Sequence, residues 1–221
     1  TSRNKGTESA TAAVGVTTNN FSVKNAVEAW VKDMTGKQMG QFSCKNAEQE
    51  AVVHLVAQRV LQEHADAASG FVGKSEPVRA LITGGPGVGK SFVIKATRQL
   101  FDKLNYSNGT EYAFAGLQAV VAAQLHGQTL HSLFGLNLYG QATTSQDRIS
   151  DIAAKLTHMR WIIIDEISQV TCELLSQCEK QARSMVQDVG TYRLDGDKLV
   201  RPWAGINVLY LSLIHKLRLR R

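Results

Sequence analysis

The segment Gly84-Gly85-Pro86-Gly87-Val88-Gly89-Lys90-Ser91 combines residue types and spacing suited to holding phosphate groups. Its glycines allow backbone N–H groups to turn inward around an anion, and the N-terminus of a following helix adds a favourable dipole. In this pattern the lysine reaches the β- and γ-phosphates, and the serine hydroxyl ligates Mg²⁺. We therefore expect this loop to bind a nucleoside triphosphate, most simply Mg-ATP, with Lys90 in a catalytic position and Ser91 as a metal ligand.

Two acidic residues, Asp165 and Glu166, follow the apolar run from Trp161 to Ile164. A strand that ends at Asp165 places this carboxylate at the carboxyl edge of a sheet, where it can hold the Mg²⁺ shell. Glu166 can then act as the general base that polarises the attacking water. Many strands end in acids that are merely solvated. This pair, however, follows the glycine loop by about 75 residues, so we interpret the two segments as halves of one hydrolytic site.

A third segment, from Gly127 to Gly135, lies between these two and contains Thr129, His131 and Phe134. A histidine beside apolar residues is more often structural than functional, and a phenylalanine is more often part of a core than a platform for a nucleic-acid base. The residues alone leave both interpretations of this segment open.

The elements that must position these residues alternate between strands and helices. Apolar runs predict strands at residues 78–83, 111–115, 160–165 and 206–211. Helices are expected at residues 47–64, 90–104, 118–125, 145–158 and 171–187, with a shorter amphipathic helix at 25–34. This alternation predicts an α/β fold of the P-loop NTPase type, with three layers and a central, mostly parallel sheet. Ligands of such sheets bind beyond the carboxyl ends of the strands.

The composition is that of an ordinary soluble globular protein, with 43% hydrophobic and 20% charged residues. The net charge is +6, but four of these charges come from the basic residues of the last ten positions, so charge alone does not establish nucleic-acid binding. The longest apolar run, Trp161 to Ile164, is too short to span a bilayer, and we expect no membrane partner.

The chain begins with Thr1 rather than Met, and no signal segment opens it, so we expect a fragment or a processed end. Residues 1 to about 20 lack periodicity, which predicts a disordered lead. Cys44, Cys172 and Cys178 have no metal-ligand spacing. They are interpreted as reduced thiols of an intracellular protein; whether the compartment is the nucleus or the mitochondrion stays open.

Together these segments resemble the petite-integration-frequency (Pif) helicases of superfamily 1, which are ATP-driven DNA helicases that unwind 5′ to 3′. The resemblance runs from about Asn46 to Leu211. It implies a RecA-like motor domain at residues 41–211, after a partly disordered extension at 1–40 and before a basic tail at 212–221. The family also has a second RecA-like domain, which we expect to be missing from these 221 residues. The resemblance therefore implies ATP binding with weak or no unwinding by these residues alone.

The resemblance assigns roles to individual residues. Asn46-Ala47-Glu48-Gln49 is similar to the adenine-contacting segment, with Gln49 as the base-reading amide. The glycine loop and Ile164-Asp165-Glu166-Ile167-Ser168 match the two nucleotide motifs. Thr129 to Phe134 matches the motif that binds single-stranded DNA, which implies that Thr129, His131 and Phe134 contact the strand. Gln118 stands where the family has a Thr-Gly pair and could still bond a phosphate.

After Leu211 this sequence departs from the family pattern. The family continues Gly-Asp-Phe-x-Gln-Leu, whose glutamine senses the γ-phosphate; here only Leu217 agrees and Lys216 replaces the glutamine. Such a departure is typical of a shifted reading frame or a missed splice. Two alternatives to an active motor therefore remain. One is an inactive remnant that binds nucleotide or single strands. The other is an unrelated P-loop ATPase, such as a loader or signalling ATPase, which leaves the Thr129 segment without a role.

Overall fold

A parallel sheet forms the centre of the computed structural model, which describes residues 22–36, 42–69, 75–185, 193–195 and 197–213. Its strands follow the order β1-β5-β4-β2-β3, and every neighbouring pair is parallel. They are β1 (Arg79–Gly84), β2 (Tyr112–Gly116), β3 (Gln128–Thr129), β4 (Trp161–Ile164) and β5 (Asn207–Leu213). The expected α/β fold is confirmed. β3 was not expected, because two polar residues carry no apolar run.

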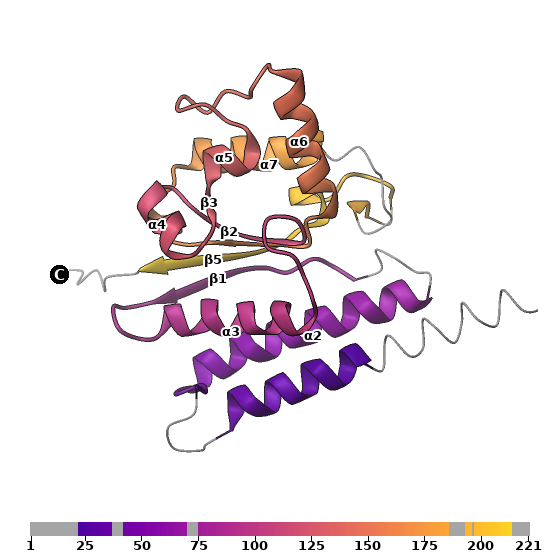
Figure 1. The fold of residues 1–221 in the computed structure, drawn as a ribbon, viewed down its shortest axis with the longest axis vertical. Helices are drawn as coiled ribbons and strands as arrows, with labels where there is room; N and C mark the ends of the chain where they lie inside the picture. Colours follow the sequence, from indigo (N-terminus) through magenta and orange to yellow (C-terminus); the bar gives the residue numbers. More distant parts are fainter. Residues whose placement is uncertain (1–21, 37–41, 70–74, 186–192, 196, 214–221) are drawn as a thin grey trace, which may run out of the picture.

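Helices cover both faces of the sheet (Figure 1). The layer on one face consists of α2 (Ala47–Ser69), α3 (Lys90–Lys103) and a helix at residues 22–35. The opposite layer consists of α5 (Leu130–Phe134), α6 (Gln146–His158) and α7 (Cys172–Met185). The short helix α4 (Ala119–Gln124) lies near the carboxyl ends of the strands. The expected three-layer arrangement is therefore confirmed.

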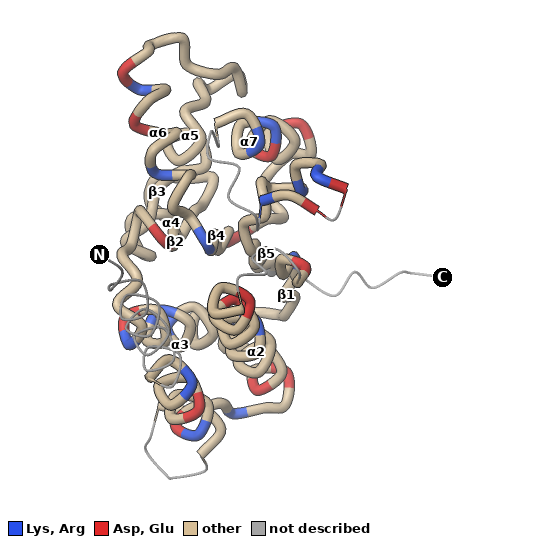
Figure 2. Tube along the Cα trace, turned by 90° about the vertical axis from the view of Figure 1, so that its right-hand side faces the viewer, with Lys and Arg blue, Asp and Glu red and all other residues tan. Residues whose placement is uncertain are grey.

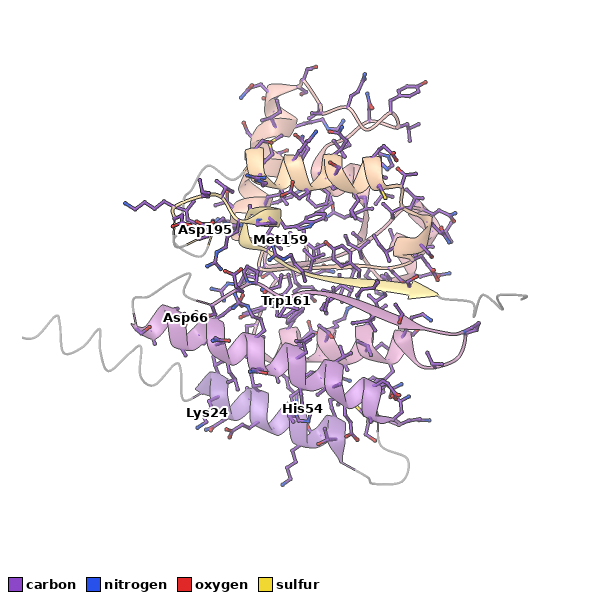
Figure 3. All side chains as sticks on the ribbon, turned by 180° about the vertical axis from the view of Figure 1, so that it is seen from behind. Lys24, His54, Asp66, Met159, Trp161 and Asp195 are labelled. Atoms are coloured by element: carbon purple, nitrogen blue, oxygen red, sulfur yellow. The ribbon has the colours of Figure 1, made fainter. Side chains whose placement is uncertain are left out.

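The alternation of side chains along β4 explains how one apolar run serves both layers. Trp161 and Ile163 belong to the core shared with α2 and α3, whereas Ile162 and Ile164 belong to the core beneath α5, α6 and α7. Successive strand residues point to opposite faces, so a strand covered on both sides must be apolar throughout. In Figure 3, Trp161 lies at the level of the sheet, between the two helical layers.

The helix at residues 22–35 is an integral part of the first core. Val27, Trp30 and Met34 are buried in it, and Trp30 Nε1 donates a hydrogen bond of 3.0 Å to the carbonyl of Ala96 on α3. The expected helix at 25–34 is thus confirmed, with three more residues at its start. Its burial shows that this part of the N-terminal extension packs with the rest of the fold. The expected disordered lead lies outside the described residues.

Most observed boundaries lie within one or two residues of the expected ones, and α2 and β5 extend further. α2 continues to Ser69 instead of stopping at His64, because the alanines after His64 favour a helix without adding to its apolar stripe. β5 continues to Leu213, where Ser212 pairs with Thr83 and Leu213 pairs with Gly84. The first two residues of the expected basic tail therefore belong to the sheet, while residues 214–221, with Lys216 and Leu217, lie outside the described residues.

Charges of both signs are interspersed along the helices of both layers (Figure 2). This distribution agrees with the sequence observation that the body of the chain is only mildly basic. A partner with a negatively charged backbone must therefore be recognised by particular side chains rather than by a uniformly basic face.

Candidate nucleotide-binding site

The glycine loop connects β1 to α3, as a phosphate-binding loop requires. Gly84 is the last residue of β1, and Gly89 immediately precedes α3. Gly87 and Gly89 have φ values of 77° and 90°, a region that residues with a Cβ rarely adopt. Gly89 is also closely approached, since a Cβ at this position would lie 2.2 Å from Gln49 Nε2. The loop conformation therefore requires glycine at this position for two separate reasons.

Lys90 is folded over the start of its own loop. Its Nζ donates hydrogen bonds of 2.8 Å to the carbonyl of Gly84 and 3.0 Å to the carbonyl of Gly85. Neutral carbonyls are weaker partners for an ammonium group than phosphate oxygens are. The two bonds keep Lys90 Nζ at the start of the loop. A bound triphosphate can therefore replace the two carbonyls as the partner of Nζ.

The side chain of Gln49, in the first turn of α2, forms a hydrogen bond with the glycine loop. Its Nε2 donates to the carbonyl of Val88 over 2.9 Å, and its Oε1 accepts from the backbone N–H of Lys45 over 2.8 Å. The side chain is buried. One end of the amide thus holds the loop, a contact that the sequence did not predict, and the other end is anchored to Lys45 just before α2. Base reading by Gln49 stays a prediction, and it requires the amide to exchange at least one of these partners.

Cavities flank the loop on two sides. One, of about 290 Å³, lies between α2 and β1 and is lined by Gln49, Val52, Ile82 and Lys90 among others. The other, of about 430 Å³, lies at the start of α3 and includes Phe42, Phe92, Ser91 and Lys95. The rings of Phe42 and Phe92 lie 4.6 Å apart.

An apolar wall with a few polar groups is typical of a small-molecule site. Phe42, Phe92 and Lys95 were not identified from the sequence. The sequence did contain a signal for this cavity: one aromatic residue lies two positions after the loop lysine, and another lies shortly before α2.

The acid pair lies at the end of β4. The backbone N–H of Asp165 donates to the carbonyl of Ala115 over 2.9 Å, which extends the β4–β2 pairing by one residue. The carboxylate of Asp165 accepts from the N–H of Glu166 over 2.9 Å. Glu166 has φ 51° and ψ 47°, a left-handed conformation that is uncommon for a residue with a side chain and clusters at functional sites. The sharp turn after β4 thus fixes the directions of two successive carboxylates.

The strand order brings the loop and the acid pair to the same edge. β5 lies between β1 and β4, with Leu213 opposite Gly84 and Tyr210 opposite Ile164. Across the sheet, β1 and β4 are two strand spacings, roughly 10 Å, apart, and the register places Ile164 three residues before Gly84 along the strand direction. The donor set of a serine hydroxyl (Ser91) and a carboxylate (Asp165) supplies the hard oxygen ligands that Mg²⁺ prefers. The residues present therefore fit the expected metal.

The four expected DNA contacts differ in their surroundings. Gln118 is exposed immediately before α4, and His131 is half-buried on α5. The hydroxyl of Thr129 accepts from the N–H of Ser132 over 3.1 Å and so caps α5. Phe134 is fully buried, and its ring lies 5.7 Å from that of Trp203. A side chain without exposed surface cannot stack on a base, so the expected DNA contact of Phe134 is corrected to a core position.

An exposed turn between α5 and α6 adds a feature that the sequence analysis missed. Leu138 and Tyr139 are 88% and 89% exposed at its tip. The carboxamide oxygen of Asn137 accepts from the N–H groups of Tyr139 (2.9 Å) and Gln141 (3.0 Å), which stiffens the turn. Asn137 and Gly140 flanking an aromatic residue are the sequence signal for such a turn. The turn projects from the layer of α5 and α6 (Figure 1).

Among the helices in the described ranges, none has the length and apolar character needed to cross a membrane.

Cys44, Cys172 and Cys178 are free, and burial raises the pKa of the Cys178 thiol to about 12. A thiol with so high a pKa is not a nucleophile near neutral pH.

Comparisons with known proteins identify a matching family and solved structures similar to this chain. A family model described as an AAA domain matches residues 72–189, more than half of the chain. Among solved structures, Pif1 helicase from Candida albicans is 24% identical with a TM-score of 0.51, over 78% of this chain and 34% of that one. Unliganded Pif1 from Bacteroides sp is 21% identical with a TM-score of 0.46, over 80% and 33% of the two chains. No curated protein matches the sequence.

The likeness to the Candida structure shows a shared fold. The chain spans about a third of the length of these solved helicases.

Proposed function

The chain belongs to the AAA domain family, and on this premise we propose that it is the ATP-binding motor part of a Pif-like 5′ to 3′ DNA helicase. One observation carries the proposal. β1, β5 and β4 are adjacent and parallel, so their carboxyl ends lie at the same edge of the sheet. The glycine loop that leads to Lys90 follows β1, and the acids Asp165 and Glu166 follow β4, so both lie at this edge. A site with a phosphate cradle, a metal-holding carboxylate and a general base has the parts needed for hydrolysis of a triphosphate.

In this mechanism the protein groups act in sequence on the nucleotide. The loop N–H groups and the α3 N-terminus bind the phosphates, and Lys90 exchanges its bonds to Gly84 and Gly85 for bonds to phosphate oxygens. Mg²⁺, held by Ser91 and Asp165, would neutralise charge on the phosphate oxygens. Glu166 orients a water molecule for attack on the γ-phosphate and accepts its proton. The αL backbone of Glu166 directs its N–H to the carboxylate of Asp165, which holds that carboxylate in place.

Single-stranded DNA is the second ligand that we propose. Gln118, Thr129 and His131 lie on or beside the short elements α4, β3 and α5. The exposed ring of Tyr139 adds a surface on which a base can stack. The solved Bacteroides Pif1 bound to single-stranded DNA is one of the structures with a similar fold. Phe134 contributes to this surface only by supporting α5 from beneath.

The test compares wild-type protein with Lys90→Ala and Glu166→Gln in ATP binding and in DNA-stimulated ATP hydrolysis. Lys90→Ala is expected to weaken ATP binding at least about tenfold, because it removes a charge-assisted contact. Glu166→Gln is expected to bind ATP within about twofold of wild type while losing turnover by about a hundredfold, the usual contribution of a general base. The exposed Lys24→Ala, on the helix at residues 22–35, is the matched control and should resemble wild type.

Equal hydrolysis rates for all variants would contradict the enzymatic proposal. If ATP and an oligo-thymidine strand still bind while no variant turns over, the protein is the inactive binding remnant instead. If ATP is hydrolysed with no effect of DNA and no DNA binding, the unrelated P-loop ATPase is the better description. Gln118→Ala, His131→Ala and Tyr139→Ala should each weaken DNA binding without changing ATP affinity in the absence of DNA.

A further inference from the structure

Trp203 occupies an unusual backbone conformation directly before β5. It belongs to the 3-10 turn η3 (Pro202–Gly205), in which Trp203, Ala204 and Gly205 have φ values of 56°, 50° and 75°. Two successive residues with a Cβ in the left-handed region persist only where the surrounding contacts enforce that conformation. The turn is therefore held against the preference of Trp203 and Ala204 for negative φ.

The contacts that enforce the turn come from three different elements. The ring of Trp203 is 5% exposed and lies 5.7 Å from the ring of Phe134 on α5. It also lies 6.3 Å from the ring of Tyr210 on β5. The backbone N–H of Trp203 donates to the carboxylate of Glu179 on α7 over 3.2 Å. One side chain thus bridges α5 and β5, while its backbone is held by α7.

The two aromatic partners lead to the two proposed binding surfaces. Phe134 is on the five-residue helix that carries His131. Tyr210 is opposite Leu81 of β1 and Ile164 of β4 in the sheet, so it lies between the strands that end at the phosphate loop and at Asp165. Close-packed cores absorb a shift of a large ring poorly, so Trp203 provides a direct route by which a movement of α5 reaches β5.

We propose that Trp203 is a positioning residue that couples the DNA-facing segment α5 to the nucleotide edge of the sheet, through Phe134 on one side and Tyr210 on the other. The left-handed turn is the bistable element, and the two ligands bias its conformation. This inference rests on the proposed function, since it requires that both ATP and single-stranded DNA bind.

The experiment measures the dissociation constant of ATP on the full 221-residue chain, without and with a saturating oligo-thymidine strand. Linkage requires the same factor to appear in DNA affinity when ATP is varied. For wild type we expect this coupling factor to be at least about fivefold, the lower end of ordinary allosteric couplings. Trp203→Leu should reduce it to between one and two, while each ligand alone binds within about threefold of wild type. Trp203→Phe, which keeps an aromatic ring between Phe134 and Tyr210, should retain coupling.

Two further variants separate coupling from loss of stability. Trp30→Leu removes another buried tryptophan, but on the opposite face of the sheet, and it should keep the wild-type factor. Ala204→Gly stabilises the left-handed turn without touching the ring, and it should lower the factor at least about twofold, because a ligand can shift only an equilibrium that has two populated states. If Trp203→Leu does not fold, Ala204→Gly still tests whether the turn contributes to the coupling factor.

Each outcome decides the proposal. Coupling that survives both Trp203→Leu and Ala204→Gly, or that disappears equally in Trp30→Leu, overturns it. Wild-type protein that binds ATP and DNA with a factor of one overturns the inference and leaves the proposed function standing. Wild-type protein that binds neither ligand overturns the proposed function and this inference with it.

Discussion

Single residues in the phosphate loop act through backbone geometry as much as through their chemistry. Gly89 combines a φ of 90° with a close approach to Gln49, whereas an added Cβ at Gly85 meets no atom within 4 Å. The two glycines are four positions apart, yet the structure demands glycine strictly only at Gly89. Their substitution separates the effect of backbone strain from the general effect of changing the loop.

We expect Gly89→Ala to weaken ATP binding at least about tenfold and to lower the free energy of unfolding by about 1–3 kcal/mol, the usual cost of a strained left-handed residue. Gly85→Ala is the matched variant and should change the free energy of unfolding by less than about 0.5 kcal/mol. Isothermal calorimetry with ATP and urea unfolding check both. Equal effects of the two substitutions would mean that the left-handed conformation and the Gln49 contact are not the reason for glycine.

At the scale of elements, the helix at residues 22–35 is part of the hydrophobic core and not a separate appendage. Trp30 is fully buried and bonded to α3, and loss of such a side chain leaves a large cavity. We expect Trp30→Ala to lower the free energy of unfolding by about 3–5 kcal/mol. On the same helix, Glu28 forms an exposed pair with Lys24 at 3.8 Å, and Glu28→Ala should cost less than about 0.5 kcal/mol. Urea denaturation followed by circular dichroism measures both, and a small effect of Trp30→Ala would show that this helix is dispensable.

A pH-dependent contact links α2 to the turn after α3. His64 Nε2 lies 3.0 Å from the hydroxyl of Tyr106, and the pKa of His64 is lowered from 6.5, first by burial and then by the positive charge of Arg160. The folded protein therefore favours the neutral imidazole, and the unfolded chain takes up the proton first as pH falls. The stability contribution is complete above about pH 6.5 and is lost as pH falls through the lower folded pKa.

Urea unfolding at pH 7.5 and at pH 5.5 should consequently show a larger loss of stability in wild type than in His64→Gln. Glutamine keeps a polar partner for Tyr106 but does not titrate. Parallel behaviour of the two proteins would show that His64 does not set this part of the pH dependence.

At the scale of the whole molecule, Asn207 joins elements that are distant in the sequence. Its carboxamide oxygen accepts from Arg59 Nε and from the N–H of Val78, both over 2.8 Å. Its Nδ2 donates to Glu63 Oε1 over 2.6 Å and to the carbonyl of Arg160 over 3.0 Å. The side chain is fully buried. It therefore fixes α2, the entry to β1, the entry to β4 and β5 in one arrangement.

Asn207→Leu keeps a branched side chain but removes the acceptor for Arg59 Nε and for the Val78 N–H, while Arg59 keeps its ion pair with Glu63 at 3.1 Å. We expect it to lower the free energy of unfolding by about 3 kcal/mol or more. Asn108, exposed and with one side-chain bond to the carbonyl of His126, is the matched asparagine, and Asn108→Leu should cost less than about 1 kcal/mol. Chemical denaturation compares them, and a neutral Asn207→Leu would show that the network adds no stability.

Local sequence determined the parts of this protein that depend on contiguous residues. The glycine loop, the acid pair and the alternation of strands and helices were all predicted, because each is encoded by neighbouring residue types or by a short period. The short elements β3 and α5 were missed because two and five residues carry no periodic signal.

Tertiary structure decided which of these local features meet. It placed β5, the last strand among the described residues, between β1 and β4, and it brought Gln49 to the carbonyl of Val88, 39 residues away. It also assigned Phe134 to the core and gave Trp203 its two aromatic neighbours. Such contacts depend on the packing of faces from distant segments, and no local propensity records them. The sequence by itself therefore determined the phosphate chemistry of this protein, and only the tertiary structure decided how that chemistry is connected to the rest of the molecule.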